Sequence, residues 1–76
     1  MLKPLPAPLR DFLFHSAESG MGYQTGDIRL HSGTVFRDVV FLEGALSGVR
    51  HFKDLPFEPE DIAEITLTHR RWPWQE

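Results

Sequence analysis

The chain contains no cysteine, and this absence excludes disulfide bonds, zinc sites built on thiolates and cysteine nucleophiles. It also lacks any apolar run close to the roughly 20 residues that a membrane-spanning helix needs. The first residues, Met1-Leu-Lys-Pro-Leu-Pro, do not form the uninterrupted apolar core of a signal peptide. From these absences we expect a cytoplasmic protein without a membrane span.

An excess of basic residues is missing as well. The chain has 8 lysines and arginines against 11 aspartates and glutamates, which gives a formal net charge of −3. Proteins that bind nucleic acid usually carry a basic excess or a basic stripe, so the overall charge disfavours this function. The acidic residues between Asp54 and Glu64 are followed by His69, Arg70 and Arg71, and such opposite charges can steer a partner protein.

The remaining composition is that of a small globular domain. The chain has 76 residues, of which 41% are hydrophobic and 25% are charged, close to the average of folded proteins. A chain of this length buries only roughly 60% of its unfolded surface, which leaves room for one small core. Domains of this size without disulfides or metals often gain stability by forming oligomers.

Hydrophobic periodicity divides the chain into segments. Leu9, Phe12 and Leu13 recur at helical spacing, and from Tyr23 onward the period changes to that of β-strands. Glycine-containing pairs at 32–33 and 43–44 predict the turns between strands. We expect an extended proline-rich arm over 1–8, a domain over 9–69 with a helix at 9–19 and strands at about 23–31, 34–42, 45–52 and 64–69, and a tail over 70–76.

These segments predict an α+β fold, in which an N-terminal helix packs on a small, strongly bent antiparallel β-meander of four to five strands. The expected shape is a partial barrel of the SH3 or Sm-like kind. Alternation places Val35, Val39 and Phe41 on one face of the strand over 34–42 and Phe36, Val40 and Leu42 on the opposite face. A strand that is apolar on both faces is expected at the centre of the sheet.

No pattern of a known catalytic site is present. The carboxylates are scattered, a G-x-S-x-G nucleophile elbow is absent, and we expect a non-catalytic protein without a cofactor. The histidines form no HxxxH, HxH or HExxH spacing. A metal site remains a third hypothesis, because His31, His51 and His69 all lie near predicted strand ends and could meet at one rim.

The sequence therefore favours a protein-interaction module, with an unidentified protein partner or a weak homodimer. This hypothesis rests on the strand that is apolar on both faces and on the tryptophan-containing tail of a chain that has little core. The expected contact residues are Val35, Val39, Phe41, Trp72 and Trp74.

A nucleic-acid-binding β-barrel is the alternative hypothesis, and it rests on the arginines. Arg29 and Arg37 are expected to be adjacent across the first hairpin. The candidate contacts are Arg29, Arg37, Arg50, Arg70 and Arg71.

The segment Ile28-x-Leu30-x-Ser-Gly33-x-x-Phe36-x-x-Val39 is similar to the first conserved segment of Sm-like RNA-binding proteins. The resemblance implies a helix followed by a five-stranded bent barrel. The second-strand glycine of that family is replaced here in the region of Arg37 and Asp38, and its RNA-reading loop and Arg-Gly pair are absent. The resemblance therefore implies no RNA-binding residue.

Overall fold

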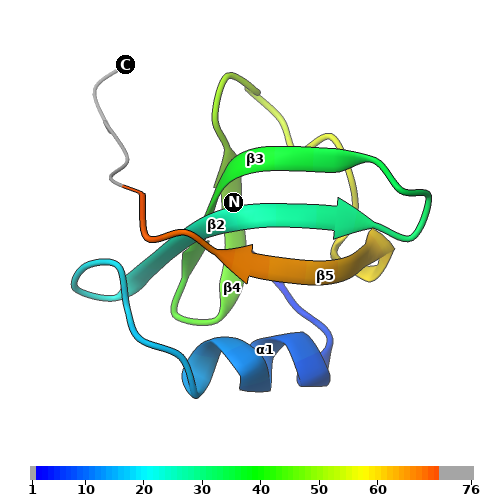
Figure 1. The fold of residues 1–76 in the computed structure, drawn as a ribbon. Coiled ribbons are helices and arrows are strands. Elements are labelled where there is room, and N and C mark those ends of the chain that lie inside the picture. The colour runs from blue at the N-terminus through cyan, green and yellow to red at the C-terminus, as the bar shows by residue number, and fades with distance from the viewer. Residues whose placement is uncertain (1, 71–76) are drawn as a thin grey trace.

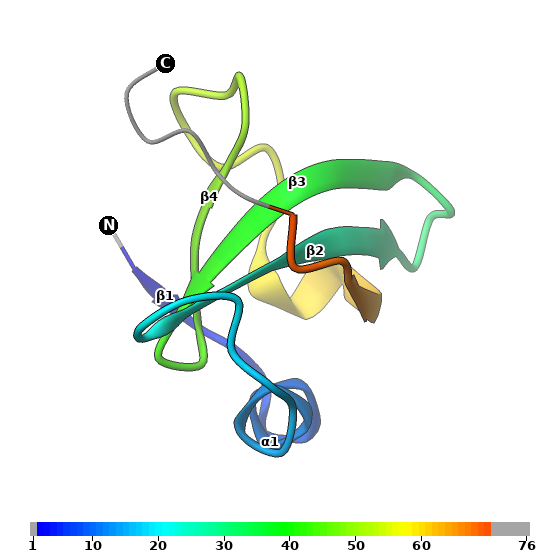
Figure 2. The ribbon, with the colours of Figure 1, turned by 60° about the vertical axis from the view of Figure 1, so that its left-hand side comes forward.

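Five strands form one antiparallel sheet in the computed structural model, which describes residues 2–70. The elements are β1 (Lys3–Pro4), α1 (Ala7–Phe14), β2 (Tyr23–Leu30), β3 (Val35–Leu42), β4 (Ala45–Val49), the short 3₁₀ helix η1 (Pro59–Asp61) and β5 (Ile62–Leu67). The order across the sheet is β1-β4-β3-β2-β5; Figure 1 labels the last four of these strands, and Figure 2 labels β1. The sheet curls into a half-barrel with α1 below it, which confirms the expected α+β fold (Figure 2).

The helix is shorter than predicted and begins earlier. It follows Pro6 and has Pro8 in its first turn, where a missing backbone N–H costs nothing. It ends at Phe14 instead of extending to residue 19. The reason is local: the Ser16 hydroxyl donates to the Phe12 carbonyl, with 2.6 Å between Oγ and O, and such side-chain bonds compete with continued helix.

A buried side chain from β2 holds the end of the helix. The Gln24 amide Nε2 donates to the carbonyl oxygens of Leu13, at 2.9 Å, and Ala17, at 3.1 Å. These carbonyls lie at or after the last turn, where the regular helical donors end; the Leu13 carbonyl also accepts the backbone N–H of Ser16 at 3.1 Å. Gln24 thus fixes α1 against the sheet.

The strand boundaries differ from the predicted ones at a few residues. β4 ends at Val49 rather than 52, because Arg50 and His51 turn the chain and His51 has a φ of 71°. β5 begins at Ile62 rather than 64, directly after η1, and ends at Leu67, two residues before His69 at φ 55°. Part of the expected proline-rich arm forms β1, with Lys3 opposite Leu46 on β4.

A β-bulge decides which face of β3 is buried. Gly26 lies opposite Val39 and Ile28 opposite Phe36, so two residues of β3 oppose the single Asp27 on β2. One of the two, Asp38, has a φ of 56°, and its N–H donates to Oδ1 of Asp27 at 3.2 Å. The extra residue reverses the alternation of side chains along the strand.

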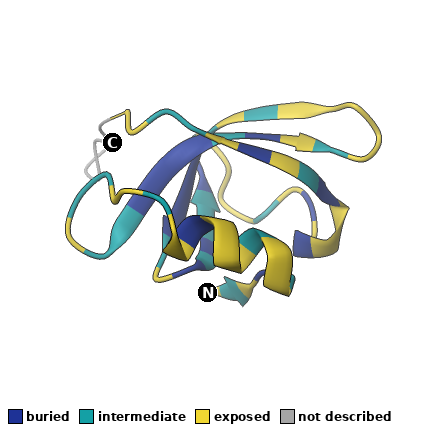
Figure 3. Ribbon diagram, turned by 60° about the horizontal axis from the view of Figure 1, so that its bottom comes forward, coloured by how far each residue is buried: buried dark blue, intermediate teal, exposed yellow. Residues whose placement is uncertain are grey.

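As a consequence, the predicted division of β3 into two faces is wrong. Phe36, from one predicted face, packs against the core together with Val39 and Phe41, from the other, whereas Val35 is exposed. Figure 3 shows the buried residues gathered along the strands behind α1. The core consists of Leu5, Leu13, Ile28, Val39, Phe41, Leu46, Val49, Phe57, Ile62 and Ile65.

Glycine allows one unusually close approach between strands. A Cβ on Gly26 would lie 2.5 Å from the carbonyl oxygen of Thr66 and 3.0 Å from Cα of Leu67. At Gly48 of β4, by contrast, no atom lies within 4 Å of a Cβ built on the backbone. The bulge of β4 falls beside it at Ser47, because Val40 pairs with Gly48 and Phe41 with Leu46.

No helix within residues 2–70 has the length and apolar character needed to cross a membrane.

Candidate functional site: the free edge of strand β5

The described residues that were predicted to contact a partner protein differ in their exposure. Val39 and Phe41 have 0% of their surface exposed, so a partner cannot reach them in the folded chain. Val35 is 54% exposed and stays available. Trp72 and Trp74 lie outside the described residues. The bulge and the core explain the apolar residues on one side of β3, which are Phe36, Val39 and Phe41, and Val40 on the other side is itself only 1% exposed.

The predicted pair of arginines on the first hairpin does not form. Arg29 lies opposite Val35 in the register, whereas Arg37 belongs to the bulge. The Arg29 side chain instead approaches Glu64 on β5, with Nε 3.4 Å from Oε1, and both side chains are about half exposed. An exposed pair of this kind contributes little to stability.

Arg50 and Arg70 do come together, and they meet at Asp38. Nη1 of Arg70 lies 2.7 Å from Oδ1 of Asp38, and Nη1 of Arg50 lies 3.8 Å from Oδ2. We call Asp27, Asp38, Arg50 and Arg70 the Asp38 cluster; its formal charges cancel. Arg37 is exposed beside it, and Arg71 lies outside the described residues.

The histidines do not assemble into a metal site. Within residues 2–70, no group of three or more His, Cys, Asp or Glu side chains is placed to hold a metal ion. His31 and His69 lie at opposite ends of the β2–β5 pair, since His31 N–H donates to the Asp61 carbonyl and His69 N–H donates to that of Thr25. The metal hypothesis gains no support from this arrangement.

Ser19 and His69 form a contact that the sequence did not suggest. Oγ of Ser19 lies 2.8 Å from Nδ1 of His69 and accepts the backbone N–H of Thr25 at 2.9 Å. The Thr25 hydroxyl donates to the carbonyl of Arg70 at 2.7 Å. Together these bonds fasten the chain that follows β5 to the beginning of β2, which is a structural role.

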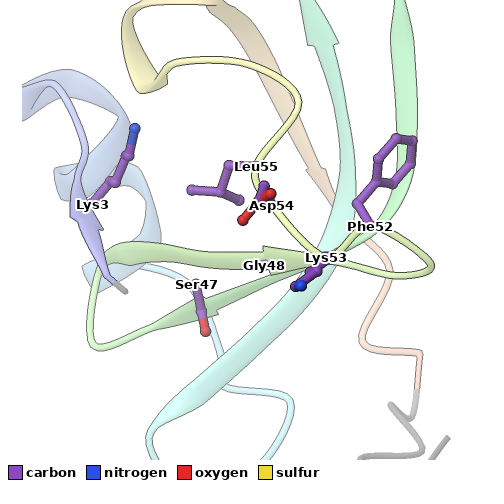
Figure 4. A pocket seen from close by; sticks show the side chains of 7 residues that line it. All are labelled: Lys3, Ser47, Gly48, Phe52, Lys53, Asp54 and Leu55. Atoms are coloured by element: carbon purple, nitrogen blue, oxygen red, sulfur yellow. The ribbon is translucent and has the colours of Figure 1, made fainter.

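A small pocket of about 260 Å³ lies where β1 stops covering β4 (Figure 4). Its lining consists of Lys3, Ser47, Gly48, Phe52, Lys53, Asp54 and Leu55. Lys3 stands on one side and Phe52 and Lys53 on the other, with Asp54 and Leu55 between them. Nζ of Lys3 is paired with Oε2 of Glu58 at 2.9 Å, so one of the two lysines is already occupied. The pocket is smaller than typical small-molecule sites.

The two edges of the sheet differ in how they are protected. β1 has only two residues and includes Pro4, and short edge strands with proline resist further pairing. β5 has six residues and no proline, and its only neighbour in the described sheet is β2. This makes β5 the open edge of the half-barrel.

Hydrogen bonds identify the backbone groups that β5 leaves unused. The Thr68 N–H donates to the Thr25 carbonyl at 3.0 Å, and Gly26 lies opposite Leu67 in the same register. Because hydrogen-bonded and non-hydrogen-bonded pairs alternate in an antiparallel ladder, Thr66 faces β2 whereas Ile65 and Leu67 direct their N–H and C=O groups away from it. Within residues 2–70, no strand lies on that side.

The side chains along this edge are of two kinds. Glu64 and Thr66 are exposed on the outer face, whereas Ile65 is buried and Leu67 is half-buried on the inner face. A shallow groove of about 230 Å³ on the outer face continues from this edge toward β3. It is lined by Asp27, Ile28, Arg29, Val35, Glu64 and Thr66, so it includes Val35, which is exposed and is the only predicted partner contact of that kind among residues 2–70.

Comparison of the chain with protein families, curated proteins and solved structures found no match.

Proposed function

We propose that this protein is a non-catalytic protein-interaction module that binds an extended segment of another protein chain along β5. The observation that carries the proposal is the six-residue antiparallel edge strand, on which the backbone groups of Ile65 and Leu67 point away from the sheet. In strand addition of this kind, main-chain hydrogen bonds supply affinity, and pockets for alternate side chains supply specificity.

The two faces of the edge suit different side chains of the bound segment. On the inner face, the half-buried Leu67 would contact apolar side chains and so continue the core. On the outer face, the groove that includes Val35 and Arg29 would receive the intervening side chains. The favoured partner is therefore a β-strand with alternating apolar and polar residues.

We expect short peptides selected from a phage-displayed random library on this protein to bind along β5. Their binding should be lost when Ile65 is replaced by N-methyl-isoleucine in synthetic protein, because this change removes an outward donor and keeps the side chain. Isothermal titration measures the affinity, and thermal melting of the modified protein verifies that it is folded. Failure to enrich any peptide on protein that is monomeric under the selection conditions, or equal affinity for the modified protein, would contradict strand addition at β5.

Binding of nucleic acid by the Asp38 cluster is a second candidate function. It is favoured by the convergence of Arg50 and Arg70 on one carboxylate, with Arg37 exposed beside them. Asp38 opposes it, because a carboxylate neutralises the arginines that would contact phosphate.

This second candidate predicts that Asp38→Asn binds a single-stranded oligonucleotide more tightly than the parent protein and with a steeper dependence on salt. The substitution removes one negative charge, and asparagine tolerates the φ of 56° that this position requires. Fluorescence anisotropy with a labelled oligonucleotide at low and moderate salt measures both effects. If neither protein binds at low salt, this function is excluded.

A further inference from the structure

We infer that the strand that pairs with β5 is β5 of a second copy of this chain, arranged antiparallel about a two-fold axis at Thr66. This inference rests on the proposed function of the β5 edge and names its partner. The arrangement is a symmetric dimer in which the same patch of each copy is used, the commonest form of oligomer.

Backbone complementarity selects the register. Ile65 and Leu67 carry the outward groups, so Ile65 of each copy must face Leu67 of the other, and both N–H and both C=O groups of each pair are then satisfied. Thr66 faces its own counterpart at the axis as a non-hydrogen-bonded pair, because its backbone groups are used by β2. A shift of the register by one residue would place the outward groups of Ile65 and Leu67 opposite residues whose own N–H and C=O groups point toward β2. The hydrogen bonds between the two copies would then be lost.

Side chains are compatible with this register on both faces. On the inner face, Ile65 meets Leu67, and the half-buried Leu67 gains an apolar neighbour. On the outer face, Thr66 meets Thr66, a favourable cross-strand pair. Glu64 lies opposite Thr68, so no charged residue faces a like charge.

The path of the chain leaves this edge accessible up to the last described residue. After Leu67 the chain turns toward β2 and β3, where His69 and Arg70 are bound by Ser19 and Asp38 (Figure 1). The segment therefore runs from β5 toward β3, away from the free edge. Self-association would join two five-stranded sheets into one continuous sheet.

The test uses charge at the axis. Thr66→Lys and Thr66→Glu each place like charges opposite each other in the dimer, so each variant alone should dimerise more weakly than the parent, by roughly two- to fivefold in dissociation constant. An equimolar mixture should restore association and form the Lys–Glu heterodimer in preference to either homodimer. Analytical ultracentrifugation measures the constants, and native mass spectrometry counts the three dimer species.

Thr34→Lys and Thr34→Glu are matched controls, since Thr34 is exposed in the turn before β3, and they should leave association unchanged. A parent protein that stays monomeric at high concentration overturns the inference, as does a mixture that forms the three dimers in statistical proportion. A dimer that persists with N-methyl-isoleucine at position 65 overturns it too. A monomer that still binds selected peptides through Ile65 refutes self-pairing alone, whereas a monomer that binds none refutes strand addition as well.

Discussion

Replacing Phe41 with alanine should leave little folded protein. Phe41 is the largest of the side chains that are completely buried, and truncating a buried phenylalanine costs about 3–5 kcal/mol in the free energy of unfolding. A chain of 76 residues is expected to have a total stability of about 4–11 kcal/mol. The loss is therefore a large share of the total, and urea denaturation followed by circular dichroism measures it.

Val35→Ala is the matched control from the same strand. Val35 is 54% exposed, so its truncation should change the free energy of unfolding by no more than about 0.5 kcal/mol. Comparison of Phe41→Ala with Val35→Ala distinguishes a core position from an interface position. If Phe41→Ala were as stable as the parent and had lost only its ability to associate, Phe41 would be an interface residue. The assignment of Phe41 to the buried face of β3 would then be incorrect.

Gly26→Ala should produce the second-largest loss of stability. The added methyl group would lie 2.5 Å from the carbonyl oxygen of Thr66 and 3.0 Å from Cα of Leu67, and both obstacles are backbone atoms of β5. Since backbone cannot rotate away as a flexible side chain can, β5 must move from β2. Overpacking of this kind costs about 1–3 kcal/mol.

The effect of Gly26→Ala should be detectable in β5 itself as well as in the stability of the whole protein. In Gly26→Ala, amide hydrogen exchange should accelerate at Thr66 and Thr68, whose N–H groups face β2. Gly48→Ala is the control, because no atom lies within 4 Å of its added methyl group and its φ is not positive. It should be neutral or stabilising by up to about 1 kcal/mol. Equal losses for both variants would show that β2 and β5 do not approach as closely as described.

Residue order alone predicted the elements of the fold and their local turns. Gly33 and Gly44 both have positive φ, at 96° and 78°, in the turns where a Ser-Gly and a Glu-Gly pair were expected to reverse the chain. Periodicity is a local property, so α1 and the successive strands β2, β3 and β4 were predicted in the correct order. Their ends were less accurate, because Ser16, Gln24 and His51 act through side-chain bonds or backbone angles that periodicity does not contain.

Most of the candidate site could not be predicted from the sequence. Strand 64–69 was expected, but its pairing with β2, and therefore its position at a free edge, depends on contacts between residues distant in sequence. Of the predicted contact residues for a partner, Val35 is exposed beside that edge, whereas Val39 and Phe41 are core. The contact of Arg50 and Arg70 with Asp38 could not be predicted either, because the three residues come from three segments of the chain that are separate in the sequence.

The sequence by itself determined that this protein has one N-terminal helix and a meander of strands, because hydrophobic spacing and turn glycines act over a few residues. Tertiary structure alone decided which face of β3 is inside and which strand edge is open. The bulge opposite Asp27 adds one residue to β3 and so reverses its alternation. Such an insertion is stable only when the neighbouring strand is present, because the N–H of the bulged Asp38 donates its hydrogen bond to Oδ1 of Asp27 on β2.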